Sequence, residues 1–380
     1  MEYKKINELT TVVTGGTPST RKNEYWDNGD IPWLQSGCCQ NCDVDSTEKY
    51  ITKEGYNNSS THMMSADTVM IALTGATAGK VGYLKFEACG NQSITGILPC
   101  ESLNQRYLFF YLLSQREKIL ADCVGGAQAH ISQSYVKNMT IPILAIKEQE
   151  QIVGELTKVS NIVSLRQEEI QQLDNLVKAR FVEMFGDCTN MISLSELCLI
   201  ITDGTHQSPK FQHDGIPFIL VSNLSKNTVT YDTDKFISAE TYKELYKRTP
   251  IEIGDILLSI VGSYGHPAVV VEDRKFLFQR HIAYLKPKSD ILNSYYMHGA
   301  LLSPGCQRQI EEKVKGIAQK TLNLSEIRKI RIPVSSLDLQ KQYADFVHQV
   351  NKSKFDTMTF APIYAIINLY LHTYFYQGRR

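Results

Sequence analysis

The strongest constraint on this chain is that its sequence is written twice. Short segments of the first half return in the same order about 190 residues later. Three examples are TGGTP at 14–18 and TDGTH at 202–206, IPW at 31–33 and IPF at 216–218, and Ile-Pro at 141–142 and 332–333. Solenoid repeats have periods of roughly 20–50 residues, so this spacing predicts a tandem duplication of a whole domain.

Length and composition are those of a soluble globular protein with two to three domains. The 380 residues include 40 basic and 40 acidic side chains, and the nine cysteines form no disulfide framework. Residues 1–190 carry 17 Lys and Arg against 22 Asp and Glu, whereas residues 191–380 carry 23 against 18. The N-terminus shows no signal peptide, so we expect a cytoplasmic protein with reduced thiols. A neutral total is compatible with DNA binding only if basic groups gather on one face.

Each half begins with short β-like runs separated by Gly, Asn and Asp, which is typical of strands joined by turns. A stretch with apolar residues at helical spacing follows, at 104–122 and at 292–314. Both halves then continue through a polar loop and an Ile-Pro strand into a long helix. The pattern predicts an α+β fold with four parts: two mixed domains at 1–145 and 188–335, a central helix at 146–187, and a C-terminal helix at 336–380.

The long helix after the first half has the clearest pattern. An apolar seam steps by four and three from Ile152 to Met184, interrupted only by Arg166 and Arg180. Such a stripe is typical of a coiled coil and requires a partner helix. At ~1.5 Å per residue, the helix would extend for roughly 55 Å.

The second long helix, expected over 338–378, keeps this pattern only as far as Lys354. The segment 355–378 has one formal charge, Asp356, and contains Pro362, which would kink or end a helix. Its polar residues make a membrane span a poor fit. We therefore expect a packed or partly irregular tail.

Catalytic and metal-binding motifs are missing. The sequence has no Walker loop, no Gly-x-Gly-x-x-Gly after a strand and no His-Glu-x-x-His helix. Cys39 and Cys42 have the spacing of half a zinc site, but no second pair exists to complete four ligands. Asp255 begins a strand, as its counterpart Asp67 does, which favours a turn role. A duplicated chain without a catalytic cluster indicates binding, and a two-fold scaffold suits two DNA half-sites.

The ordered motifs resemble the specificity subunit of type I restriction–modification systems. The resemblance covers residues 1 to about 354 and rests on short motifs that occur twice. They are Gly15-Gly16-Thr17-Pro18-Ser19, Trp26 before Ile31-Pro32-Trp33, the 73–82 strand-turn, Asn91-Gln92, and the Gly-Ala-Gln, Ile-Pro-Ile, Glu-Gln-Glu-Gln progression.

This resemblance implies two target-recognition domains joined by two antiparallel coiled-coil spacer helices, with approximate two-fold symmetry. Each domain would read half of a split target in double-stranded DNA. The helices would dock methyltransferase (M) subunits, and restriction (R) subunits would join the larger complex. The chain itself would be non-catalytic, would bind no membrane, and would leave S-adenosylmethionine, ATP and Mg²⁺ to its partners.

Base edges are read by Arg or Lys at guanine and by Asn or Gln at adenine, while other contacts hold phosphates. The loops of the first half that carry such side chains hold Thr17, Ser19, Arg21, Lys22, Thr77, Lys80, Gln92, Gln128, His130 and Lys137. Those of the second half hold Thr205, His206, Lys210, Ser263, Tyr264, His266, Arg280, Lys315, Gln319 and Lys320. Trp26 and Trp33 are expected to pack in the core.

Two other functions fit the same sequence. One is a stand-alone DNA endonuclease with a catalytic cluster that the motifs do not reveal. The other is a protein that binds a methyltransferase without reading DNA, for which salt-sensitive but sequence-independent DNA binding would be evidence.

Overall fold

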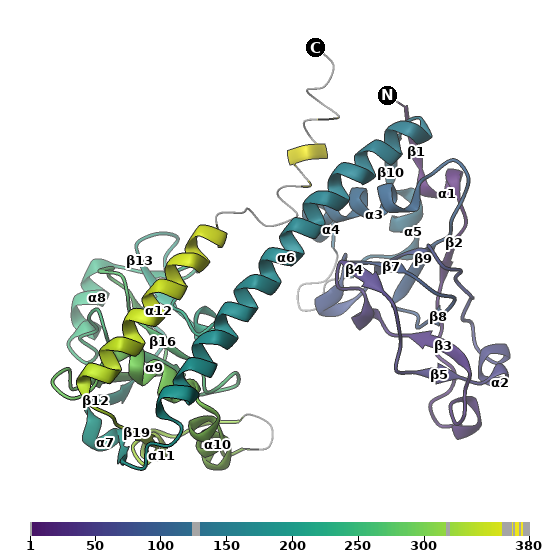
Figure 1. The fold of residues 1–380 in the computed structure, drawn as a ribbon. Coiled ribbons are helices and arrows are strands. Elements are labelled where there is room, and N and C mark those ends of the chain that lie inside the picture. The colour runs from purple at the N-terminus through teal and green to yellow at the C-terminus, as the bar shows by residue number, and fades with distance from the viewer. Residues whose placement is uncertain are drawn as a thin grey trace. The chain divides into compact units, whose positions relative to one another are not determined.

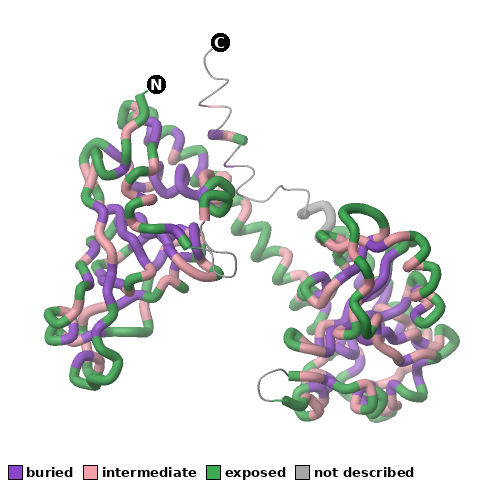
Figure 2. Tube along the Cα trace, turned by 180° about the vertical axis from the view of Figure 1, so that it is seen from behind, coloured by how far each residue is buried: buried purple, intermediate pink, exposed green. Residues whose placement is uncertain are grey.

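The computed structural model describes residues 2–123, 130–316, 320–358, 367, 369–371 and 374. It divides into two compact units, the first formed by residues 1–166 and 360–380 and the second by residues 167–359. Each unit has its own buried core, drawn in purple in Figure 2.

The first unit is built on a five-stranded sheet with the order β2-β9-β6-β7-β4. A three-stranded sheet, β5-β3-β8, and the pair β1-β10 accompany it (Figure 1). The strands are β1 (Glu2–Lys5), β2 (Val12–Thr14), β3 (Ile31–Leu34), β4 (Cys42–Val44), β5 (Tyr50–Ile51), β6 (Val69–Ala72), β7 (Val81–Leu84), β8 (Cys89–Gly90), β9 (Ile94–Ile97) and β10 (Thr140–Ile143). The helices are α1 (Ile6–Leu9), α2 (Lys53–Asn57), α3 (Gln105–Ser114), α4 (Arg116–Ala121) and α5 (Gln133–Asn138), with 3-10 turns η1 (Asn23–Tyr25), η2 (Ser36–Cys38) and η3 (Gly75–Thr77).

The second unit repeats this plan with one strand fewer in the main sheet. Its sheets have the orders β12-β18-β15-β16, β14-β13-β17 and β11-β19. The strands are β11 (Met191–Ser193), β12 (Cys198–Asp203), β13 (Ile216–Ile219), β14 (Phe236–Ile237), β15 (Ile256–Ser259), β16 (Pro267–Val269), β17 (Leu277–Phe278), β18 (Ile282–Pro287) and β19 (Arg331–Pro333). The helices are α7 (Leu194–Leu197), α8 (Ala239–Tyr246), α9 (Ser294–Leu302), α10 (Pro304–Lys313) and α11 (Leu324–Ile327), with the 3-10 turn η4 (Val221–Leu224). The two halves therefore share a strand order and a helix order, as the duplication predicted.

Each helical stretch predicted at 104–122 and 292–314 is two helices. The second break has a direct cause, because Pro304 lacks an amide hydrogen and its ring would clash with the preceding turn. Ser303 ends α9 and then caps α10, its hydroxyl accepting the Cys306 amide hydrogen at 3.3 Å. Pro304 takes the first helical position, where no donor is needed. In the first unit, α3 and α4 meet at Gln115.

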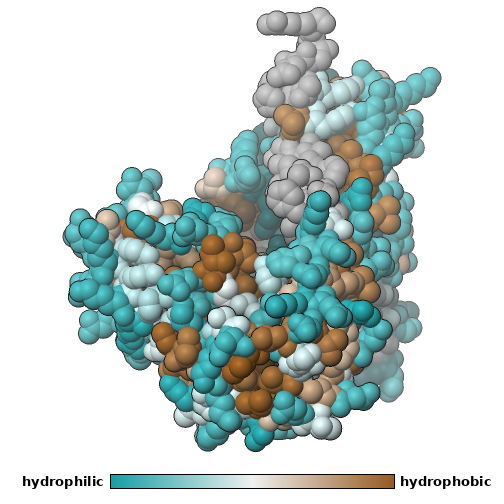
Figure 3. Space-filling model, turned by 60° about the vertical axis from the view of Figure 1, so that its left-hand side comes forward, coloured by the Kyte–Doolittle hydropathy of each residue, from teal (hydrophilic) through white to brown (hydrophobic). Residues whose placement is uncertain are grey.

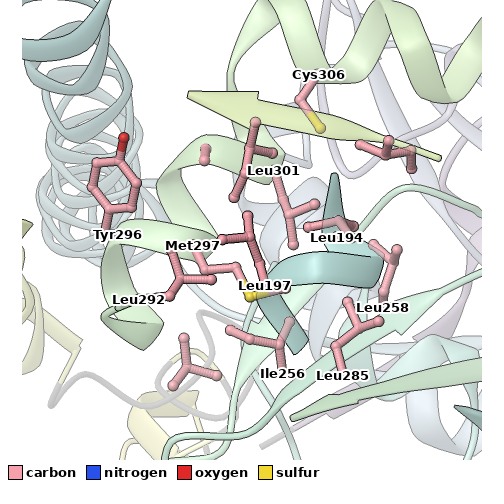
Figure 4. Close-up of a cluster of buried hydrophobic side chains, with 14 of the residues drawn as sticks. Leu194, Leu197, Ile256, Leu258, Leu285, Leu292, Tyr296, Met297, Leu301 and Cys306 are labelled. Carbon is pink, nitrogen blue, oxygen red and sulfur yellow. The ribbon is translucent and has the colours of Figure 1, made fainter. Parts of the chain in front are cut away.

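The core of the second unit forms where the main sheet meets α7, α9 and α10. Side chains from these elements point toward one another in Figure 4, among them Leu194, Leu258, Leu285 and Leu301. The four residues of β15 are all buried, and three consecutive ones, Ile256 to Leu258, are apolar, so the strand shows no alternation of apolar and polar residues. Because the strand residues are buried in this core, polar side chains lie on the loops that join the strands.

A 40-residue helix, α6 (Ile146–Phe185), follows the first sheet, as the sequence predicted (Figure 1). Within the second unit its last turns pack against α12 (Leu337–Met358). The Tyr343 hydroxyl donates to the carbonyl of Val177 at 3.4 Å, and the Lys354 ammonium contacts the carboxylate of Asp174. Contacts therefore move backward along α6 as they move forward along α12, so these two segments are antiparallel.

The C-terminal tail contributes to the core of the first unit. Ile367 and Leu371 are buried there, and Tyr370 donates a hydrogen bond to Glu155. The helix predicted over 338–378 is observed as α12 up to Met358, and most residues beyond it lie outside the described part of the chain. None of the described helices is long and apolar enough to cross a membrane. Hydrophilic side chains are interspersed with hydrophobic ones on the face in Figure 3.

A buried glutamine in the first turn of each long helix makes the same hydrogen bonds in both units. Gln149 accepts the Asn104 amide hydrogen at 2.8 Å and donates to the carbonyl of Leu144 at 2.9 Å. Gln340 accepts the Asn293 amide hydrogen at 2.8 Å and donates to the carbonyl of Ser335 at 2.9 Å. Both side chains have 0% exposure. Each therefore ties the start of a long helix to the start of α3 or α9.

Replacing Gln340 with leucine is expected to lower the free energy of unfolding of the second unit by about 3 kcal/mol. The change leaves the Asn293 amide and the Ser335 and Ile291 carbonyls without this partner. Each buried polar group left without a hydrogen bond costs about 1–3 kcal/mol. Urea denaturation followed by far-UV circular dichroism measures the loss. Gln342→Leu is the matched control, because Gln342 is exposed on the same helix. Equal losses in both variants would contradict the role assigned to Gln340.

Candidate nucleic-acid interface

Most of the predicted contact residues meet at one end of each main sheet. In the first sheet β2 and β6 end where β9 and β7 begin, as the pairs Thr14–Thr95 and Ile71–Val81 show. We call the loops joined there, at 15–22, 73–80 and 91–93, the first loop end. The corresponding loop segments of the second sheet, at 204–210, 260–266, 279–281, 315–316 and 320–321, form the second loop end. Antiparallel pairing places alternate strand ends on the same side, which brings these distant segments together.

At the first loop end, Thr17 and Gln92 are in direct contact. The Thr17 hydroxyl donates to the Gln92 side-chain oxygen at 2.5 Å, and both residues are exposed. Lys80 donates to the side-chain oxygen of Gln40 at 2.6 Å. His130 forms a backbone bridge to Thr74, three residues before Thr77. The Thr74 hydroxyl also donates to the Ser93 hydroxyl at 2.9 Å, so these contacts connect five separate segments of the chain.

The other predicted residues of the first unit are distributed unevenly. Ser19 and Arg21 are exposed on the segment after Thr17, and the Lys22 ammonium contacts the Tyr25 hydroxyl at 2.9 Å. Lys137 is half-buried on α5, a helix that packs against α1. Gln128 lies outside the described residues, as Gln319 does in the second unit.

At the second loop end, backbone contacts link two of the predicted residues, and charged groups surround them. The Arg280 amide donates to the carbonyl of Thr205 at 3.1 Å. Asp203 binds both the Arg248 guanidinium, at 2.8 Å, and the His206 ring, at 3.1 Å. The Lys320 carbonyl accepts the Gly262 amide hydrogen at 3.0 Å, next to exposed Ser263. This surface therefore carries more cationic groups than the first loop end.

The remaining predicted residues of the second unit line or flank the same loops. The Lys320 ammonium lies 5.8 Å from the centre of the Tyr264 ring, and Lys315 pairs with Thr321 through the backbone. The His266 ring contacts the Asn227 side chain at 3.0 Å, and burial lowers its pKa, so the ring is neutral at pH 7. Lys210 is exposed on the loop after β12.

Sequence reasoning missed the pocket beside the first loop end. It has a volume of about 810 Å³ and is lined by Thr17 and Gln92 together with Asn23, Trp26, Lys49 and Asn91. Trp33, 3% exposed, packs edge-on against Trp26 with ring centres 5.0 Å apart. The expected packing role is thus confirmed for Trp33, which is buried, and both tryptophans also line the pocket.

The same aromatic pair occurs in the second unit, which offers a signal that could have found it. Phe211 lies 5.3 Å from Phe218, the counterpart of Trp33. The amide hydrogens of Trp33 and Phe218 are donated to the carbonyls of Lys49 and Lys235, respectively. The Lys235 ammonium lies 4.9 Å from the centre of the Phe211 ring. An aromatic pair with a nearby lysine is therefore part of the duplicated plan.

Asp255 has the structural role that was expected of it. Its carboxylate is 3% exposed, accepts the Tyr284 hydroxyl at 2.9 Å and pairs with Lys286 at 3.3 Å. Among the described residues, no three or more His, Cys, Asp or Glu side chains gather in a way that could hold a metal ion. Cys39 is buried and Cys42 is exposed, both as free thiols.

Comparison with known proteins gives one consistent result. The family model for the type I restriction modification DNA specificity domain matches residues 1–175 and again residues 189–362. The specificity subunit of the type I restriction enzyme EcoR124I/EcoR124II from Escherichia coli is 32% identical over 169 residues, 43% of this chain and 42% of that protein. The specificity subunit of the type I restriction enzyme MjaIX from Methanocaldococcus jannaschii is 23% identical over 354 residues, 86% of this chain and 81% of that protein.

A solved structure agrees at the level of the fold. That structure concerns complex assembly and conformational transition of the type I R-M system. The match has 17% identity and a TM-score of 0.51, and covers 98% of this chain and 97% of that one. The match to the Escherichia coli relative, by contrast, spans less than half of that protein's length.

Proposed function

The chain belongs to the type I restriction modification DNA specificity family, and we propose that it reads a bipartite target in double-stranded DNA for such an enzyme. The observation that carries this proposal is the pair of equivalent loop ends, one on each unit. Both present exposed hydrogen-bonding or cationic side chains from several loops at once. Because the side chains differ between the two, the two half-sites should differ in sequence.

The proposal assigns the chemistry to partner subunits. Methyltransferase subunits would carry S-adenosylmethionine, and restriction subunits would use ATP and Mg²⁺, while this chain would be non-catalytic and cytoplasmic. The antiparallel pair formed by α12 and the end of α6 offers a docking surface. Leu176 and Val182 are 48% and 47% exposed on this part of α6, and apolar residues exposed on a helix mark sites of association.

The test is a selection experiment on the complex. The tagged chain is purified from its native cells with whatever subunits accompany it, and is then offered duplexes of random sequence. We expect a methyltransferase to co-purify, and the selected duplexes to share two short blocks around a gap of constant length. Divalent-metal-dependent cleavage by the chain alone would instead indicate an endonuclease. Salt-sensitive binding without a shared sequence would indicate an interaction protein that does not read DNA.

A further inference from the structure

One position of the fold is equivalent in the two loop ends but carries a neutral side chain in the first and a cationic side chain in the second. The amide of Asn91 donates to Leu34, and that of Gln279 donates to Ile219, in the corresponding strands β3 and β13. The carbonyls two residues later, on Ser93 and His281, accept the amide hydrogens of Leu73 and Ile260. The residues between them, Gln92 and Arg280, are therefore structural equivalents.

Their neighbours confirm this equivalence. Gln92 contacts Thr17 through its side chain, and Arg280 contacts Thr205 through its backbone amide. Thr17 and Thr205 are themselves counterparts in the duplicated sequence. Gln92 and Arg280 both lie in the turn that leads into an inner strand of their sheet, β9 or β18, and both are exposed.

Each of the two residues lines a pocket that holds one cation and one carboxylate, Lys49 and Glu48 in the first unit and Arg280 and Asp203 in the second, but the polar groups around them differ. Gln92 lines a pocket rich in amides, with Asn23, Asn28, Gln35 and Asn91, in which Lys49 is the cation. Arg280 lines a smaller pocket with Asp203 and His281. Burial and the neighbouring Arg280 lower the pKa of His281, so its ring is neutral at pH 7 and Arg280 is the cation of that pocket.

Arg280 is also available to a ligand. The carboxylate of Asp203 is engaged by Arg248 and His206. Among the described residues, no carboxylate lies within ion-pair distance of the Arg280 guanidinium, which is exposed. A guanidinium donates two parallel hydrogen bonds to O6 and N7 of guanine, whereas a glutamine amide both donates and accepts at N7 and N6 of adenine.

We propose that Gln92 and Arg280 are the matched specificity residues of the two units, Gln92 selecting adenine in one half-site and Arg280 selecting guanine in the other. This inference rests on the proposed function and adds to it the base that each unit reads. It makes one difference between the two half-sites a consequence of one substitution within a duplicated frame. The two residues should act independently, because they belong to separate units.

The test uses the full chain with its co-purifying subunits and a library of random duplexes, for the unaltered protein and for Arg280→Gln and Gln92→Arg. We expect the unaltered protein to select guanine in one block and adenine in the other. Arg280→Gln should reduce the preference for that guanine by roughly 10–100-fold and leave the other block unchanged. Gln92→Arg should reduce the preference for the adenine in the other block alone.

Lys275→Gln is the matched control for charge, since Lys275 is an exposed cation of the same unit that precedes β17 and lies outside the second loop end. It should leave the selected bases unchanged. If both variants select the same bases as the unaltered protein, this inference is overturned while the proposed function stands. The same conclusion follows if the block read by the second unit contains no guanine. An unaltered complex that selects no split sequence overturns the proposed function as well. The two substitutions lie in different units. If one variant misfolds, the other therefore still tests the base assigned to its own unit.

Discussion

Replacing Phe181 with alanine is expected to lower the free energy of unfolding of the second unit by about 3–5 kcal/mol. Phe181 is 3% exposed, and its ring centre lies 5.3 Å from those of Tyr296 on α9 and Tyr343 on α12. Gly299 allows this close approach, because a Cβ there would lie 2.8 Å from the Phe181 ring. Truncation would therefore leave a cavity at the junction of three helices.

The chain provides a selective measurement of this effect. Its two tryptophans, Trp26 and Trp33, both lie in the first unit. The loss in the Phe181→Ala variant should thus appear in urea unfolding followed by circular dichroism, and not in the transition followed by tryptophan fluorescence. Val182→Ala is the control, as Val182 is 47% exposed on the same turn of α6, and it should change stability by less than about 0.5 kcal/mol. A loss below about 1 kcal/mol for Phe181→Ala would show that the ring is not an anchor.

The duplicated architecture could be predicted from the sequence because repeated motifs occupy repeated places in the fold. The short β-like runs of the first half are observed as strands, among them β6, β7 and β9, since buried strands are short runs rich in apolar residues. The central helix was also predictable from its period. Phe181 and Phe185 lie beside the predicted seam, because a helix that packs against a globular core buries a wider stripe than a coiled coil does.

The candidate site could be predicted only in part. Loop residues such as Thr17 and Gln92, 75 positions apart, meet because antiparallel strands bring their loops to one sheet end. Periodicity carries no such information, so the pocket with Trp26 and the pairing of Asp203 with Arg248 were not foreseen. Nor could the sequence show which core receives the apolar tail, since burial depends on contacts across more than 200 residues.

Replacing both Ile367 and Leu371 with alanine is expected to destabilise the first unit by at least about 4 kcal/mol, since each buried aliphatic truncation costs about 2–5 kcal/mol. The two side chains have 0% and 3% exposure and pack in the same core as Ile152 and Leu156. Their spacing of four residues equals that of Val177 and Phe181, which are buried in the second unit. Each core is therefore completed by a segment that lies outside the domain limits expected from the repeats.

Tryptophan fluorescence should detect this loss directly, because both tryptophans report on the first unit. The unfolding transition of the second unit, which Phe181→Ala shifts, should keep its midpoint in this double variant. Each variant should therefore destabilise one unit and leave the other unchanged. Leu369→Ala is the control, since Leu369 is 69% exposed in the same tail segment. A fluorescence transition that does not move would show that the tail adds nothing to the first core. A shift confined to the other transition would assign the tail to the second unit, against the packing described above.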